Sequence, residues 1–269
     1  MATAPSDPIA ALTQIGFDVQ YLSHAKSILN AEFAPQLVEL AGVLTGVRLP
    51  ITEIIGSGGG ETPFTQRTRR ALAALDWRKH NFVIGKTIDG VQREATSHEV
   101  DHVKWVDGVG TLGCEIEWNN KDPFFDRDLE NYKRLHTEGA ISVGIIITRG
   151  ASLQAALWDM VHRFAISRGI VDFASLAAAG VTPTPKQKTS IQARVDRGVP
   201  FAEAWTDNFV SNKFGAATTH WEKLQARVTR GVGNPCPLLN IGLPASIVVF
   251  DPGPVEQIDE EPEVPTPPP

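Results

Sequence analysis

The stretch GTLGCEIEW, residues 110–118, decides the fold because it combines a core-like strand with two acids on one face. Its apolar residues occupy alternate positions, as in a strand with one face against a core. Glu115 and Glu117 flank Ile116 and therefore share the opposite face. The later stretch AISVGIIITR, residues 140–149, is nearly continuous in apolar and β-branched residues, which is typical of a strand buried on both faces. A strand packed beside it should also bury both faces, so the two acids require an explanation.

Two Asp-Gly pairs upstream place this strand in an antiparallel meander. Asp-Gly between extended runs is a strong hairpin signal, because the tight primed turn needs positive φ angles. The sequence therefore predicts three strands joined by turns at residues 89–90 and 107–109. The expected strands are 81–88, 91–105 and 110–118.

Helices are expected before and after the meander. Residues 62–80 open with Thr-Pro, which suits a first helical turn, and residues 122–139 run from a Pro to a terminal Gly. The resulting order is helix, three strands, helix, strand, which is an α/β arrangement. Outside this core we expect helices within 23–44 (divided at Pro35), 151–169, part of 197–214 and 219–231, a loop at 182–188, and a late strand or two within 236–250.

The composition is that of one globular domain with a short arm and a tail. The chain has 269 residues, of which 42% are hydrophobic, so it can bury a substantial core. We expect an N-terminal arm at 1–22, a single domain at 23–250 with its core at about 62–149, and a tail at 251–269. The tail is rich in proline and holds six acids and no base, which equals the net charge of -6. Such a segment should be disordered, and the body before it is neutral by count.

Other features exclude several classes of protein. Two cysteines without CxxC spacing fit a reducing cytoplasm rather than a disulfide framework. The sequence has no signal-like start and no apolar run long enough for a membrane span, so we expect a soluble, cytoplasmic protein. The stretch GSGGGE, residues 56–61, is not a P-loop, because no Lys-Ser/Thr follows the glycines.

The second hairpin should gather carboxylates. With a three-residue loop at 107–109, Asp101 faces Glu115 and Glu99 faces Glu117. Directly opposed residues have Cβ atoms about 4.5–5.5 Å apart on one face, so the acids would crowd together. A two-residue loop would shift this register by one. Asp107 lies in the turn, too far along the strand to reach Glu115.

Crowded carboxylates need a compensating cation. Hard oxygen ligands suit Mg²⁺, or Mn²⁺ in its place. Lys104 or Lys121 could compensate instead, and an exposed hairpin face with ordinary solvated acids is the alternative. A metal held by carboxylates beside basic helices points to phosphodiester hydrolysis, which needs no organic cofactor. The basic residues of the first predicted helix are Arg67, Arg69, Arg70, Arg78 and Lys79.

The element order, with an acid on the second strand and acid-x-acid on the third, resembles the PD-(D/E)XK nuclease core. The stretches HEVDHVK, EIEWNNKDPFFDRDL, GAISVGIIITR and THWEKLQARVTRG followed by CPLL resemble the BglII/BstYI-like type II restriction endonucleases, relatives of BamHI. The resemblance covers about residues 50–245. It implies a mixed central sheet flanked by helices in αβββαβ order.

The resemblance also implies that Asp101, Glu115 and Glu117 are the metal-binding and catalytic acids. The usual final Lys of the motif is Glu117 here, so its work on the attacking water must fall to Glu117 or to a metal-bound water. Lys121 is a poor substitute, because it lies four residues further along.

Candidate DNA contacts follow from charge and position. Phosphate contacts would come from the basic residues of 62–80. Base readers should lie near the metal, where residues 148–152 leave the core. The candidates beyond the first helix are Lys121, Arg149, Ser152, Asn212, Lys213, Thr218, Thr219 and His220.

The implied activity is Mg²⁺-dependent cleavage of double-stranded DNA at a short, palindromic site by a homodimer, in a bacterial or archaeal cell. Three alternatives stay open: a repair or structure-specific nuclease on the same core, a non-catalytic DNA-binding protein whose acids are solvated, and a protein whose acidic tail is the functional part.

Overall fold

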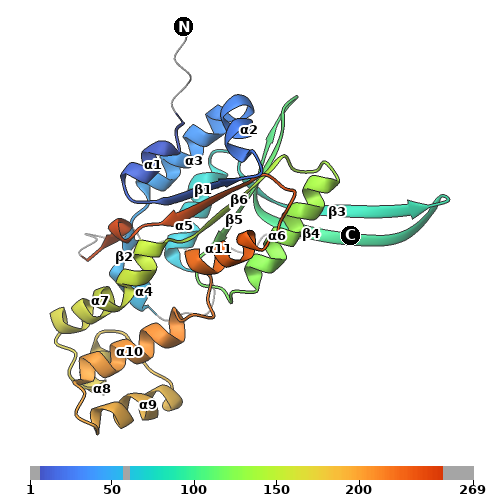
Figure 1. The fold of residues 1–269 in the computed structure, drawn as a ribbon. Helices are drawn as coiled ribbons and strands as arrows, with labels where there is room; N and C mark the ends of the chain where they lie inside the picture. Colours follow the sequence, from blue (N-terminus) through green and yellow to red (C-terminus); the bar gives the residue numbers. More distant parts are fainter. Residues whose placement is uncertain (1–6, 57–60, 251–269) are drawn as a thin grey trace.

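The computed structural model describes residues 7–56 and 61–250, and its centre is a six-stranded mixed sheet with helices on both faces (Figure 1). The strand order is β1-β7-β6-β5-β4-β3. Strands β5, β6 and β7 are parallel, whereas β1, β4 and β3 pair antiparallel. This confirms the predicted α/β class. The strands are β1 Asp18–Leu22, β3 Arg78–Ile88, β4 Val91–Val106, β5 Gly110–Glu117, β6 Val143–Arg149 and β7 Leu238–Leu243.

Helices cover the two faces of the sheet unequally. One face carries α6 (Phe124–Thr137) and α11 (Trp221–Thr229). The other carries α1 (Ala10–Gln14), α2 (Ala25–Glu32), α3 (Ala34–Gly46), α4 (Ile51–Ile55), α5 (Pro63–Ala73) and α7 (Ala151–Ser167). After α7 come α8 (Phe173–Ala178), α9 (Pro185–Val195) and α10 (Phe201–Lys213), which extend away from the sheet (Figure 1). A small parallel pair joins β2 (Leu49–Pro50) to β8 (Val248–Val249), which follows the short helix η1 (Ala245–Ile247).

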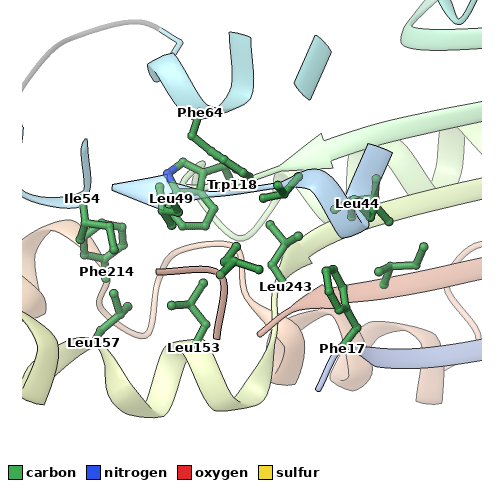
Figure 2. Packing of buried hydrophobic residues seen from close by; sticks show 14 of the residues in the cluster. Phe17, Leu44, Leu49, Ile54, Phe64, Trp118, Leu153, Leu157, Phe214 and Leu243 are labelled. Carbon is green, nitrogen blue, oxygen red and sulfur yellow. The ribbon is translucent and has the colours of Figure 1, made fainter. Parts of the chain in front are cut away.

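The core lies between the sheet and the larger helical face. Figure 2 shows Leu157 of α7 beneath Phe214 and Leu153 further along the same helix, with Phe64 and Trp118 above them. All seven residues of β6 are buried, as expected for a strand with helices on both faces. Each fully buried aliphatic side chain contributes about 1.5–3 kcal/mol.

The meander forms in the predicted register. Val106 pairs with Gly110 and His102 with Cys114, which confirms the three-residue loop at 107–109. The first turn is also as predicted, because Asp89 and Gly90 both have positive φ angles, of 51° and 78°. Beyond the body of the molecule, β3 and β4 continue as a long two-stranded ribbon (Figure 1).

A β-bulge interrupts β4 where the candidate acid lies. Arg78 pairs with Val103 but His80 pairs with Val100, so β4 has one extra residue between these two pairs. The pairing of β4 with β5 runs from Val106 to His102 and ends there, one residue short of Asp101. The predicted facing of Glu99 and Glu117 therefore does not form, and Glu99 pairs with Asn81 of β3. Bulges re-aim side chains and end ladder pairing, and here the bulge separates Asp101 from the regular ladder.

Three segments differ from the predicted structure. The helix expected over 62–80 ends at Ala73; Arg78 and Lys79 belong to β3, after a turn in which Asp76 has a φ of 62°. Residues 7–22, expected as an arm, contribute α1 and the edge strand β1. The loop expected at 182–188 contains the start of α9, because Thr184 and Gln187 form a capping box.

Elsewhere the predicted helices form with slightly different ends, and the division near Pro35 occurs at Phe33, between α2 and α3. The predicted disordered tail, residues 251–269, and residues 57–60 of the glycine-rich loop lie outside the described residues.

Candidate active site

Glu115 and Glu117 project from β5 toward α6, on the face opposite to Leu112 and Cys114. Both acids are buried, with 4% and 3% of their surface exposed. The strand tolerates these two buried acids because polar as well as apolar groups pack on this face. Thr148 on neighbouring β6 donates a hydrogen bond of 2.7 Å to the Glu117 carbonyl, which fixes the backbone at that point.

Asp101 lies across the hairpin from Glu115. Unlike Glu115, it is exposed and lines a cleft. Burial and the nearby Asp101 raise the pKa of Glu115 well above its usual range, and the two carboxyl groups are within hydrogen-bonding reach. The structure therefore brings Asp101 and Glu115 together, as the register predicts.

Glu117 lies among three polar side chains. Asn120 donates a 2.8 Å hydrogen bond from Nδ2 to Glu117 Oε2, and Arg127 Nη2 lies 3.6 Å from Oε1. The third neighbour is Asp128, on α6. Burial and then the charge of Asp128 raise the pKa of Glu117 to about 8. A carboxyl group with a pKa near neutrality is suited to accept a proton.

Asp128 is a member of this cluster that sequence reasoning missed. It is 1% exposed; Oδ1 accepts a 2.7 Å hydrogen bond from Arg127 Nε, while Oδ2 has no partner in the described part of the chain. A signal was present, because Asp128 falls three residues after Phe125 and four before Tyr132, on the apolar stripe of the helix. An acid at such a position is rarely solvated.

The oxygen ligands of four acids are of the type that a hard cation binds: Asp101, Glu115, Glu117 and Asp128. Within the described ranges, however, no three His, Cys, Asp or Glu side chains converge on one point. Mg²⁺ keeps several waters and is commonly held by one or two carboxylates plus substrate phosphate. The contacting pair Asp101 and Glu115 meets that requirement at the edge of the cleft. Glu117 lies two residues after Glu115, on the same face of β5.

The cleft has a volume of about 1010 Å³ and runs past Asp101 to the end of β5. Three cations, Arg69, Lys79 and Lys213, line it together with the hydroxyl residues Thr52, Thr62 and Thr65. Glu53 and Glu61 also line it. Cations and hydroxyls of this kind bind phosphate oxygens.

The predicted phosphate contacts form surface ion pairs. Arg67 pairs with Glu53 at 2.7 Å, Arg69 with Glu61 at 3.3 Å, Arg78 with Asp76 at 2.8 Å, and Lys79 with Glu99 at 2.7 Å. Arg70 is partly exposed on α5. The pairs of Arg69, Arg78 and Lys79 are exposed and contribute little to stability, so these three cations can exchange an acid for a phosphate at small cost. The Glu53 side chain is only 10% exposed, so its pair with Arg67 is partly buried.

The other predicted DNA contacts are divided between the surface and the interior. Lys121 and Asn212 are exposed, and Lys213 donates a 2.9 Å hydrogen bond to the Ile54 carbonyl. Ser152 accepts a hydrogen bond from Ala245 N at 3.1 Å.

Arg149, Thr219 and His220 are buried, and Thr218 is engaged by Arg149, so in this conformation none of these four presents a free polar edge to DNA. Burial also lowers the pKa of His220, which favours its neutral form.

The family model described as Restriction endonuclease BglII/BglIII matches residues 17–243. No curated protein matches the chain. Among the described residues, no helix is both long and apolar enough to cross a membrane.

Proposed function

The chain belongs to the BglII/BglIII restriction endonuclease family, and from that premise we propose that it is a type II enzyme hydrolysing duplex DNA at a short palindromic sequence with Mg²⁺. Family membership itself implies site-specific DNA cleavage. The proposed metal site rests on one observation: Glu115 contacts Asp101, which lines a cleft that also holds three cations. The proposed substrate is double-stranded DNA, and the proposed compartment is the cytoplasm of a bacterial or archaeal cell.

Asp101 and Glu115 would hold the Mg²⁺, with Glu117 nearby. When bound, the cation would polarise the scissile phosphate and stabilise charge on the leaving oxygen. Mn²⁺ would substitute, since it accepts the same oxygen ligands.

Glu117 is the residue proposed to accept the proton of the attacking water. Its pKa, raised to about 8 mainly by burial in the metal-free protein, makes the ionised carboxylate a stronger base than an ordinary glutamate. Asn120 and Arg127 hold the two carboxylate oxygens, so the acceptor is oriented before DNA binds. Glu117 thereby takes the work that the lysine of the wider motif would do.

The core is proposed to be of the PD-(D/E)XK type. Support comes from the order α5, β3, β4, β5, α6, β6, with Asp101 on β4 and both glutamates on β5. Arg69 and Lys79 line the cleft and would contact the DNA backbone there. Such phosphate contacts add affinity but carry no sequence information. Two copies related by a two-fold axis would cut the two strands of a palindrome, so we propose a homodimer.

Digestion of mixed plasmid and phage DNA tests this function. Purified protein is incubated with Mg²⁺ or with EDTA, beside a Glu115→Ala variant whose folding is checked by circular dichroism. Discrete fragments that need Mg²⁺ and are absent with the variant are expected, and their ends would give the recognition sequence. Intact DNA with folded wild-type protein and several metals would refute the proposal, and cleavage directed by DNA structure would point to a repair nuclease.

A further inference from the structure

Arg149, the last residue of β6, is fully buried and has no acidic partner in the described part of the chain. Its guanidinium lies 4.9 Å from the Phe214 ring and 5.9 Å from the Trp118 ring. Burial alone lowers its pKa, to about 9. An unpaired buried cation is costly, so its retention beside the candidate site needs a reason beyond packing.

The Arg149 guanidinium is hydrogen-bonded to two segments of chain, the one before α11 and the loop after β5. Nε and Nη2 donate to the Thr219 carbonyl at 3.2 and 2.7 Å, and Nη2 donates to Thr218 Oγ1 at 2.6 Å. Nη1 lies 3.4 Å from Asn119 Oδ1. The planar fork of arginine makes this set of contacts possible; the compact ammonium of a lysine could not reproduce it.

Thr219 connects Arg149 to the loop after β5. Asn120 N donates to Thr219 Oγ1 at 3.1 Å, and Thr219 N donates to the Asn120 carbonyl at 2.9 Å. Lys121 and Thr218 form a β-bridge beside these bonds. Asn120 then donates from Nδ2 to Glu117 at 2.8 Å. A continuous path of hydrogen bonds thus runs from Arg149 through Thr219 and Asn120 to Glu117.

We propose that Arg149 is a positioning residue that holds Asn120 against Glu117 and thereby sets the orientation of that carboxylate. This inference rests on the proposed function of Glu117. It also replaces the expectation that Arg149 reads DNA bases, because the guanidinium is buried and its hydrogen bonds go to Thr218, Thr219 and Asn119. The buried fork adds to the direct bonds between Asn120 and Thr219, because it holds the Thr219 carbonyl and Asn119 from the core side.

A double-mutant cycle tests the path. Arg149→Lys, Asn120→Ala and the double variant are compared with wild type for kcat, KM and DNA affinity, the last measured with Ca²⁺ in place of Mg²⁺. Each single change should lower kcat about 100-fold, because small errors in positioning cost that much, while KM and affinity change less than about threefold. The double variant should be no worse than the singles, since both changes break one path.

Two further variants keep the test independent of folding defects. Arg194→Lys, in the ion pair with Asp207 on α9 and α10, is the matched control and should leave kcat unchanged. Thr218→Val removes one acceptor of Arg149 and should lower kcat about 10-fold. Amide hydrogen exchange of Asn120, measured without DNA, should be faster in Arg149→Lys than in wild type.

The outcomes separate the inference from the function on which it rests. Multiplicative effects in the cycle, unchanged exchange at Asn120, or a normal kcat in Arg149→Lys would overturn the positioning role. If Arg149→Lys bound DNA more weakly and with relaxed sequence selectivity, Arg149 would instead be a residue that reads bases. If wild-type protein cuts no DNA, the proposed function fails, and the exchange measurement alone decides whether Arg149 orders the loop.

Discussion

Strand β4 belongs to two hairpins, and the acids on the two have opposite environments. In the outer hairpin, formed with β3, the Glu99 side chain is 56% exposed and pairs with Lys79 at 2.7 Å. In the inner hairpin, formed with β5, Glu117 is 3% exposed and has a pKa raised to about 8. Both hairpins turn at Asp-Gly, so this dipeptide does not explain the different environments of their acids. The position of the strand in the sheet does.

The difference follows from the neighbours of each strand. β3 is an edge strand whose residues are exposed or half-buried, and it projects from the body (Figure 1). β5 lies between β4 and β6, with α6 on one face and the main core on the other. Water solvates Glu99, whereas Glu115 and Glu117 must be compensated by the protein or by a cation.

Replacing one acid in each hairpin should give the largest contrast. Glu115→Gln keeps the size of the side chain but removes half of the proposed metal pair, so cleavage should fall about 10³-fold or more. Glu99→Gln should leave the rate within about twofold of wild type. Single-turnover cleavage of a site-containing duplex measures both. Equal losses from the two changes would remove the distinction between the hairpins.

Glycine substitutions should show that the sheet beneath α6 contributes more to the free energy of unfolding than the outer hairpin does. A Cβ at Gly144 on β6 would lie 2.4 Å from the Tyr132 ring, which is itself fixed by a 2.9 Å hydrogen bond to the Ile145 carbonyl. Gly144→Ala should therefore lower the free energy of unfolding by about 2–3 kcal/mol.

Gly90→Ala in the outer turn is the control. No atom lies within 4 Å of its Cβ, but its φ is 78°, so the cost should be about 1 kcal/mol. Urea denaturation measures both losses. A larger loss for Gly90→Ala would show that the outer turn, rather than the packing of α6 on the sheet, limits stability.

The buried acids should make metal-free protein less stable as pH rises. The pKa of Glu117 in the folded protein, about 8, exceeds the unfolded value of about 4.3, so folding favours the protonated form. The resulting stabilisation is complete below about pH 4.3 and is lost as pH rises through 8. Melting temperatures between pH 6 and 8.5 should fall, and Mg²⁺ should reduce the fall.

Glu117→Gln is the matched variant for this pH dependence. It should flatten the decline and stabilise the metal-free protein at pH 8.5 by about 1–3 kcal/mol, because an amide carries no charge to bury. Glu99→Gln should leave the slope unchanged. An unchanged slope in Glu117→Gln would assign the pH dependence to other groups.

The smallest effect is expected where the outer hairpin meets the cleft. Lys79→Ala should weaken DNA binding about threefold, equally for specific and random duplexes, and should reduce the slope of log affinity against log salt by about one unit. Fluorescence anisotropy between 50 and 200 mM salt measures this. A loss confined to one DNA sequence would instead make Lys79 a base reader.

The sequence predicts the local parts of the site well. The turn at 107–109 and the alternation of β5 together specify that Asp101 meets Glu115, because hairpin register depends on a few neighbouring residues. The family resemblance rests on the same segment, and the family match over residues 17–243 confirms it.

Features that depend on distant segments could not be predicted in the same way. Arg149 is buried by Thr218 and Thr219, about seventy residues later, so nothing near it in sequence distinguishes it from a surface arginine. β1 finds its partner only in β7. The burial of Asp128 is predictable, because the residue lies on the apolar face of a predicted helix. Its contact with Glu117 is not, because that contact depends on how α6 packs on the sheet.

The pairing of β1 with β7 has a consequence for folding. Tyr21 pairs with Leu239, so β1 can form its backbone hydrogen bonds only after the much later strand β7 has been synthesised. Until then β6 also lacks its partner β7 and presents an apolar open edge. Long-range pairing of this kind is slow and leaves the nascent chain exposed to aggregation. The yield of folded protein should therefore depend on chaperones and on temperature during synthesis more than on the stability of the finished sheet.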